Sequence, residues 1–218
     1  MLRIKFINLI KVYRLKKMMN YTKCMEKLNN KLLACCLGDG HLSSNGTFEI
    51  LHCEKQKEYL EYKASLFNAT VREKNNNGYK AFYFKKGVFN NKEMGKEIRK
   101  KLYGVMGHKY FSEYIVNHLD KFCIAILYCD DGSLIPQKRN GKIGAYKCTI
   151  SIYGSKSECE RLQNKIFELF GVKFNVNKDK NKYLLKCGTK EAKKFIPQIK
   201  ELLPHFKCFE NNKLLDNF

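Results

Sequence analysis

The sequence predicts an α+β chain that contains two αββαββα units in tandem. Three observations support this prediction. An apolar run that ends in Asp-Gly occurs twice, with Asp39 and Asp131 lying 92 residues apart. The elements that follow each aspartate come in the same order, as expected of a tandem duplication. Strand residues alternate between polar and apolar, so each unit exposes one face of a sheet and buries the other.

The first unit begins with the apolar run at residues 32–37, which has the composition of a buried helix. A strand pair interrupted at Ser-Ser-Asn-Gly follows Asp39. The next elements are a helix over about residues 54–67, a hairpin over 70–85 and a helix over about 90–102.

The second unit repeats this order after the apolar run at residues 122–129. Strands are predicted over residues 133–137 and 145–153, joined by a loop over 138–144. Ser155 and Glu158 have the spacing of a capping box and predict that a helix starts there. A hairpin over residues 172–186 and a helix from Thr189 complete the unit.

The helix that starts at Ser155 carries apolar residues at helical spacing, and these would cover the apolar face of the sheet, leaving the polar face open. They are Cys159, Leu162, Ile166 and Leu169. We therefore divide the chain into five parts. They are a basic N-terminal segment (1–23), a first αββαββα half (24–106), a linker (107–119), a second αββαββα half (120–210) and a C-terminal tail (211–218).

The composition indicates a polyanionic partner. The chain has 42 Lys and Arg against 21 Asp and Glu, a formal net charge of +21, which favours nucleic acid. The ten cysteines contain no CxxC pair and are predicted to be reduced core residues. The longest apolar run, 122–129, is far shorter than the ~20 residues of a membrane span.

We therefore expect a soluble protein that is not secreted and has no membrane partner, in a bacterial or phage-host cytoplasm or in an organelle. The basic N-terminal segment is more typical of an appended DNA-contacting or disordered stretch than of a targeting signal, and its role stays unassigned.

Both apolar runs end in an aspartate followed by a glycine. A glycine just past a helix tolerates positive φ and would close the helix. The aspartate is unfavourable there, because the helix dipole already places about −0.5 of a charge at that end. Small residues at 34, 35 and 125 would let the two helices approach, so that Asp39 and Asp131 meet. Two close carboxylates predict a cation, and hard oxygen ligands favour Mg²⁺ and a phosphodiester substrate.

The polar strand faces predict a DNA-binding surface. An antiparallel sheet covered by helices on one side, with a basic and amide-rich face on the other, can enter the DNA major groove. The base-reading candidates on these faces are Thr47, Glu49, Arg72, Lys74, Lys147, Thr149, Ser151, Lys173, Asn175 and Asn177. A register error of one residue would turn any of them toward the core.

The two motifs, LLACCLGDG (32–40) and IAILYCDDG (124–132), resemble the nine motif positions of the LAGLIDADG homing endonucleases of the single-chain, two-motif kind. The resemblance covers residues 28–209, and within the family it is strongest to the intron-encoded branch typified by the yeast mitochondrial omega-intron enzyme. It implies two halves with motif helices at their interface, and antiparallel sheets that form a DNA-binding saddle. It also implies a functional monomer, an internal pseudo-dimer that binds a long asymmetric site in double-stranded DNA.

The resemblance further implies Mg²⁺-dependent cleavage of both DNA strands with 3′ overhangs, and it assigns the metal ligands to Asp39 and Asp131. Asp130 has no counterpart, because Gly38 takes its place in the first motif. The family also places a lysine in each active site. GHKYF (107–111) and HFKCF (205–209) align Lys109, 70 residues after Asp39, with Lys207, 76 residues after Asp131.

Lys213 is the alternative to Lys207. His41 lies two residues after Asp39, but Ser133 takes its place in the second half, so a strand-face or DNA-backbone role is expected for His41.

The predicted function is that of a metal-dependent DNA endonuclease, a hydrolase of phosphodiester bonds that cuts a specific site and spreads its own intron. Two alternatives use the same scaffold. One is an RNA-splicing maturase, and the other is a noncatalytic DNA-binding regulator. The aspartates and candidate lysines in both halves favour the nuclease.

Overall fold

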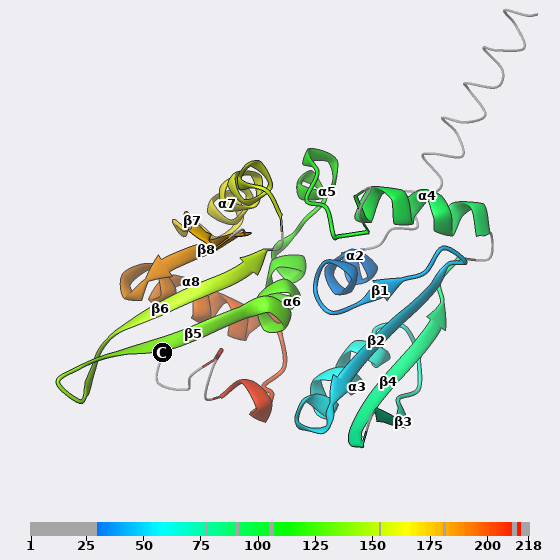
Figure 1. The fold of residues 1–218 in the computed structure, drawn as a ribbon. Coiled ribbons are helices and arrows are strands. Elements are labelled where there is room, and N and C mark those ends of the chain that lie inside the picture. The colour runs from blue at the N-terminus through cyan, green and yellow to red at the C-terminus, as the bar shows by residue number, and fades with distance from the viewer. Residues whose placement is uncertain are drawn as a thin grey trace, which may run out of the picture.

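The computed structural model describes residues 30–76, 78–89, 92–104, 107–152, 154–180, 182–210 and 213–214. The predicted N-terminal segment 1–23 lies outside the described residues. Two four-stranded antiparallel sheets, each accompanied by helices, confirm the predicted α+β fold with two units of the same order (Figure 1).

The first half contains one sheet with the strand order β1-β2-β4-β3. Its elements along the chain are α2 (Asn30–Leu37), β1 (His41–Leu42), β2 (Thr47–Cys53), the 3-10 helix η1 (Glu54–Gln56), α3 (Lys57–Ser65), β3 (Arg72–Asn76), β4 (Tyr79–Gly87) and α4 (Lys92–Leu102).

The second half repeats this topology with the strand order β5-β6-β8-β7. A short helix, α5 (Glu113–Asn117), lies in the predicted linker. It is followed by α6 (Lys121–Asp131), β5 (Gly132–Arg139), β6 (Lys142–Ile152), α7 (Lys156–Phe170), β7 (Asn175–Asp179), β8 (Lys182–Gly188), α8 (Thr189–Leu202) and the 3-10 helix η2 (Lys207–Phe209).

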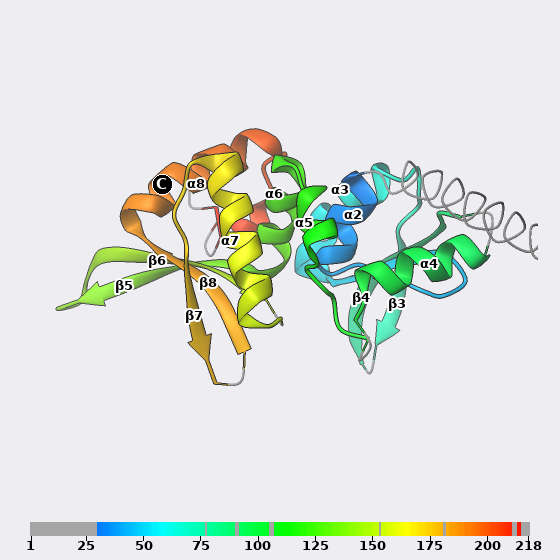
Figure 2. The ribbon, with the colours of Figure 1, turned by 90° about the horizontal axis from the view of Figure 1, so that it is seen from above.

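The two motif helices, α2 and α6, pack side by side between the sheets (Figure 1). Ala34, Cys35 and Ala125 are fully buried in this contact, and their small side chains let the backbones approach. The β3–β4 and β7–β8 hairpins project to the same side of the molecule (Figure 2). The strands of both halves thus contribute to one face, with the paired helices at its centre.

The connection between β5 and β6 is tighter than the sequence predicted. Instead of a loop over residues 138–144, the strands continue to Arg139 and resume at Lys142. Asn140 and Gly141 form the turn with φ values of 50° and 76°, as in the two-residue turns that match the twist of a hairpin. The Asn-Gly pair was therefore the turn itself.

The glycines after the motif aspartates do not adopt positive φ, so that prediction is wrong. Gly132 is extended, with φ −89°, and Gly40 is not among the positive-φ residues of the described chain. Their role is steric. A Cβ on Gly132 would lie 2.4 Å from the Tyr128 carbonyl oxygen, and one on Gly40 would lie 2.5 Å from the Cys35 carbonyl oxygen.

The capping box at α7 is confirmed, since Ser155 and Glu158 bond reciprocally. Seven of the nine described cysteines are buried and all nine are free thiols. Burial raises the pKa of the Cys35 thiol to about 12, so it stays protonated and packs as a small apolar group. None of the helices in the described ranges is long and apolar enough to cross a membrane.

Candidate active site

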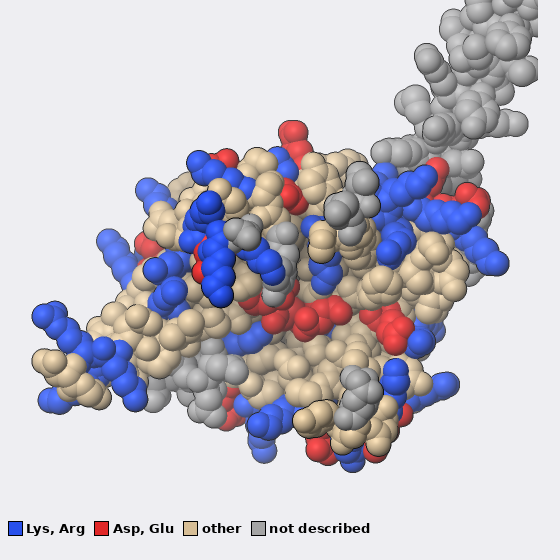
Figure 3. Space-filling model, viewed as in Figure 1, with Lys and Arg blue, Asp and Glu red and all other residues tan. Residues whose placement is uncertain are grey.

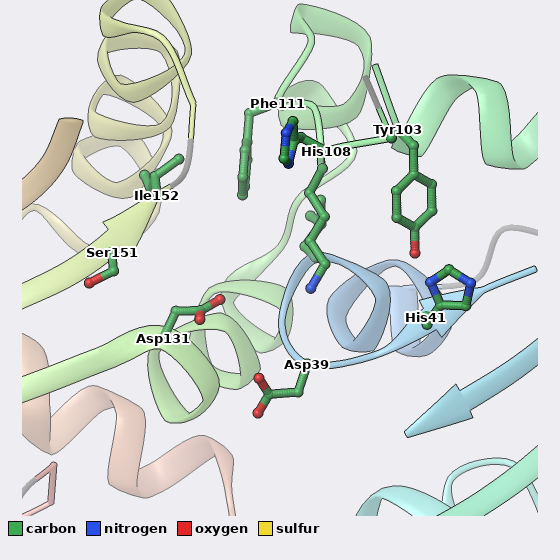
Figure 4. A pocket seen from close by; sticks show the side chains of 11 residues that line it. Asp39, His41, Tyr103, His108, Phe111, Asp131, Ser151 and Ile152 are labelled. Carbon is green, nitrogen blue, oxygen red and sulfur yellow. The ribbon is translucent and has the colours of Figure 1, made fainter. Parts of the chain in front are cut away.

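Asp39 and Asp131 face the same cavity, one from each half (Figure 4). Asp39 follows the end of α2, and Asp131 is the last residue of α6. Because these helices pack side by side, their ends bring the two carboxylates together. The cavity measures about 450 Å³, and its other lining residues are Leu37, His41, Tyr103, Gly107, His108, Lys109, Phe111, Ser151 and Ile152.

Both carboxylates are costly to ionise in this position. Burial, followed by the charge of Asp39, raises the pKa of Asp131 to about 6. Burial, followed by the charge of Asp130, raises the pKa of Asp39. The Lys109 ammonium opposes both shifts. Two partly buried carboxylates that are incompletely neutralised by a lysine form a donor set that suits a divalent cation.

Lys109 is held at the cavity by the loop between α4 and α5. The Gly104 N–H donates to the His108 carbonyl and the Tyr110 N–H to the Leu102 carbonyl, each at 2.8 Å. The Phe111 N–H, in turn, donates to Glu158 of the second half at 2.9 Å. The loop is thus tied to both halves, and three of the four predicted catalytic residues line one cavity.

Lys207, the fourth, does not line that cavity. It begins η2 and lines a different one together with Cys53, Lys55, Gln56, Cys208, Phe209 and Lys213. The Lys213 ammonium donates to the carbonyls of Cys129 and Asp130, the latter at 2.8 Å. Lys213 therefore places a positive charge at the carboxyl end of α6, where the helix dipole and two aspartates require one. Burial lowers the pKa of Lys213 overall, and the neighbouring Cys129 and Asp130 offset this only in part.

A buried charged cluster behind Asp39 was not predicted from the sequence. Lys63 of α3 and Asp130 of α6 form an ion pair of 2.5 Å, and neither side chain is exposed. Burial lowers the pKa of Lys63, but Asp130, Cys35 and Asp39 together more than offset this, so the pKa is raised overall. Burial and the Lys63 charge lower the pKa of the adjacent His52 to about 4. His52 and Lys63 both belong to the first half, whereas Asp130 lies 67 residues after Lys63 and joins them only through packing of the two halves.

His41 lines the cavity, with its ring turned toward Tyr103 (Figure 4). The two ring centroids lie 5.8 Å apart in an edge arrangement. Partial burial and the Arg99 charge lower the pKa of His41. In the second half the Ser133 hydroxyl instead lies 2.7 Å from the Thr149 hydroxyl.

The first sheet presents four of the base-reading candidates on its outward face. Strand registry pairs Glu49 with Lys85, Arg72 with Tyr83 and Lys74 with Ala81, and paired residues share a face. The alternating residues Phe48, Ile50, Phe82 and Phe84 are buried on the other side. Thr47, two residues before Glu49, shares the outward face. Glu49 is also bound to Lys85 at 3.0 Å.

The second sheet presents four of the six remaining candidates in the same way. Lys147, Ser151, Asn175 and Asn177 lie on the face opposite the buried Cys148 and Ile150. Two candidates differ. Thr149 is only 6% exposed, with its hydroxyl against Ser133. Lys173 precedes β7, and its ammonium lies 5.9 Å from the Phe167 ring of α7, so it sits beside a helix.

The charges on this face are arranged in zones. Figure 3 shows acidic side chains gathered at the centre, between the sheets, and Lys and Arg around the edges. Asp39 and Asp131 come together in this region, at the ends of the motif helices (Figures 1 and 4). A phosphate backbone laid across the sheets would meet basic groups at its flanks and a cation-binding site at its middle.

Residues 32–195 match the LAGLIDADG DNA endonuclease family, and the chain belongs to this family. Two curated proteins, both named Protein RecA, are similar to this chain. The one from Mycolicibacterium fallax is 28% identical over 204 residues, which is 86% of this chain. The one from Mycobacterium shimoidei is 33% identical over 117 residues, which is 50% of this chain. The chain spans 46% and 26% of their lengths.

Solved structures share the fold. The homing endonuclease I-WcaI bound to its DNA recognition sequence superposes with a TM-score of 0.64 at 21% identity, covering 85% of this chain and 84% of that one. The meganuclease I-SmaMI bound to uncleaveable DNA gives a TM-score of 0.52 at 14% identity, covering 81% and 84%. At these identities the similarity establishes the fold.

Proposed function

We propose that this protein is a site-specific DNA endonuclease that hydrolyses phosphodiester bonds in both strands and spreads its own intron. The observation that carries the proposal is the meeting of Asp39 and Asp131, one from each half, in a single cavity at the centre of the face formed by the two sheets. Membership of the LAGLIDADG DNA endonuclease family supports the same reaction.

Double-stranded DNA is the partner that this surface fits best. The net charge of +21 favours a polyanion, and basic and amide side chains follow the outward strand faces in both halves. The pseudo-symmetry of the halves suits a long, asymmetric duplex site bound by one chain. I-WcaI, which shares the fold, was solved bound to its DNA recognition sequence.

The donor set of the cavity fits Mg²⁺. Asp39 and Asp131 would hold the ion, because carboxylate oxygens are its preferred protein ligands and both groups have raised pKa values that a cation would relieve. When bound, the ion supplies Lewis-acid stabilisation to the phosphodiester transition state.

Two lysines of the chain would act on the attacking water and on the scissile phosphate. Lys109, in the cavity, would orient the attacking water or stabilise the charge that develops on the scissile phosphate. We assign the corresponding role in the second half to Lys213 rather than Lys207, because the Lys213 ammonium is held at the carboxyl end of α6, next to Asp131. The family resemblance implies that cleavage of both strands leaves 3′ overhangs.

Asp39→Asn and Asp131→Asn test the function. The protein should cut a duplex that carries its uninterrupted insertion site when Mg²⁺ is present. Each amide should reduce cleavage by about a thousandfold or more, because it removes a charged metal ligand, while DNA affinity measured without metal stays within a few fold. Glu201→Gln, at an exposed position of α8 on the side away from the hairpins (Figure 2), is the control for loss of a carboxylate and should leave cleavage close to that of the wild type.

Two alternatives predict different results. A maturase would bind its intron RNA tightly without cutting DNA. A noncatalytic regulator would bind DNA specifically, and the aspartate substitutions would leave its function unchanged. Either pattern in the unmodified protein would contradict the endonuclease.

A further inference from the structure

The Asp130 carboxylate is enclosed where the two motif helices meet, and three donors satisfy it. One oxygen accepts from the Lys63 ammonium at 2.5 Å and from the Tyr59 hydroxyl at 2.9 Å. The other oxygen accepts from the backbone N–H of Asp39 at 2.8 Å. Lys63 and Tyr59 belong to α3 of the first half, whereas Asp130 belongs to α6 of the second. The Asp130 carboxylate therefore connects the second half to the backbone of Asp39, the motif aspartate of the first half.

We propose that Asp130 and Lys63 are positioning residues for Asp39, and that they fix its backbone through the hydrogen bond from the Asp39 N–H to Asp130. This inference rests on the proposed function, since it concerns how one of the two metal-binding carboxylates is aimed. Neither residue faces the cavity that holds Asp39, Asp131 and Lys109, so each acts on the reaction only through Asp39.

Gly38 makes room for this contact. A Cβ on Gly38 would come within 1.8 Å of the Asp130 carboxylate oxygen, a distance that no side chain could accept. Gly38 and Asp130 hold the same place in the two motifs, one residue before the motif aspartate. Because Gly38 has no side chain, the Asp130 carboxylate of the second half can pack against it. This explains why the two motifs differ at this position.

Lys63 balances the charge that Asp130 brings into the interior. Removing it would leave a carboxylate with no exposed surface and no counter-ion. Asp39, His52 and Asp130 offer ligand atoms that all lie within 4.8 Å of one another, a spacing that could hold a metal ion. The Lys63 ammonium already lies against two of these three groups. It therefore takes the place of a cation there and leaves Asp39 available to the cavity shared with Asp131.

His52 extends the network to the Asp39 side chain. Lys63 can only donate, so its contact of 3.4 Å with His52 requires that Nε2 of the imidazole be unprotonated. The ring proton then lies on Nδ1, which is 3.8 Å from the Asp39 carboxylate. Lys63 thereby fixes the tautomer of His52 that turns a proton toward Asp39. The contact between His52 and the Asp39 carboxylate adds to the backbone hydrogen bond of Asp39, but it is too long to replace that hydrogen bond.

Two double variants isolate the contact. Lys63→Met/Asp130→Asn and Lys63→Met/Asp130→Leu both remove both charges, so neither leaves a buried ion unpaired. The asparagine oxygen can still accept the Asp39 N–H, but leucine cannot. Ile166→Ala, in the core of the second half, is the control for a general loss of stability. Each protein is compared for thermal unfolding, for hydrogen exchange of the Asp39 amide by NMR, and for the rate of Mg²⁺-dependent cleavage.

We expect the asparagine variant to keep the protection of the Asp39 amide within a few fold of the wild type. The leucine variant should lose about tenfold or more of that protection and a similar factor in cleavage rate at saturating DNA, with DNA affinity unchanged. Ile166→Ala should unfold at lower temperature but keep the protection of the Asp39 amide relative to its neighbours.

Equal amide protection in the two double variants would overturn the inference, as would a cleavage loss that follows unfolding temperature across all variants. The proposed function fails separately. If the wild type does not cut DNA under any condition, the amide exchange of the two double variants still decides whether Asp130 positions Asp39.

Discussion

At the scale of single residues, the two motif aspartates destabilise the metal-free fold when they are ionised. The pKa of Asp131 is raised from 3.8 to about 6 by burial and by Asp39. A carboxyl whose folded pKa lies above its unfolded value stabilises the fold only while it is protonated. Its contribution is full below about pH 4 and is lost as the pH rises through 6. In metal-free protein at neutral pH, this residue therefore weakens the fold.

Asp131→Asn should consequently stabilise the metal-free protein. At pH 7.5 we expect a gain on the order of 3 kcal/mol in the free energy of unfolding, because the pKa of Asp131 is raised from 3.8 to about 6, and the gain should shrink toward zero below about pH 4. Urea unfolding with a chelator present measures this. Mg²⁺ should raise the stability of the wild type and not that of Asp131→Asn. A wild-type protein that gains stability from pH 4 to pH 7.5 relative to Asp131→Asn would contradict the account.

Sequence reasoning predicted residues in a repeated pattern that the structure brings to one cavity, and it missed those that come together through packing alone. Asp39, Asp131 and Lys109 each lie in a motif that occurs twice. Lys63, Tyr59 and His52 lie in no repeated pattern, because they act on one half only. Lys207 was preferred over Lys213 on the alignment of HFKCF with GHKYF, but the geometry of the chain after η2 brings Lys213 to the end of α6, and no local signal predicts that.

At the scale of elements, alternation predicted the strand faces well and the strand ends less well. Ser151, Asn175 and Glu49 lie on the faces that their periodicity assigned, because one buried face fixes the register of a strand. Lys173 was assigned to a strand that begins two residues later, at Asn175. The loop predicted over 138–144 is paired, because the pair Asn140-Gly141 forms the whole turn.

Two basic residues, one on a sheet face and one beside a helix, provide a test of the proposed DNA-binding surface. Arg72 lies on the outward face of the first sheet and is exposed, while Lys173 lies beside α7. Arg72→Gln should reduce the slope of log affinity for DNA against log salt by about 0.9, the value for one phosphate contact. Lys173→Gln should leave the slope unchanged. Fluorescence anisotropy over a range of salt concentrations measures both, and an equal change in the two variants would contradict the proposed DNA face.

At the scale of the whole molecule, the duplication accounts for the two matching halves, and the differences between the halves at their interface account for the arrangement around Asp39. The two halves share the strand orders β1-β2-β4-β3 and β5-β6-β8-β7, and the helices between them carry one aspartate each. The sequence predicted this arrangement because two motifs 92 residues apart could form one interface. The halves nevertheless differ at that interface. Gly38 faces Asp130, and the backbone N–H of the first motif aspartate donates to this carboxylate of the opposite half.

The most direct test of the central proposal, that one carboxylate from each half holds the same divalent ion site, is anomalous diffraction from crystals of the protein with duplex DNA and Mn²⁺. We predict anomalous density between Asp39 and Asp131, within ligand distance of both carboxylates, and its loss in Asp131→Asn. Density confined to Asp39, His52 and Asp130, or none near Asp131, would contradict the account.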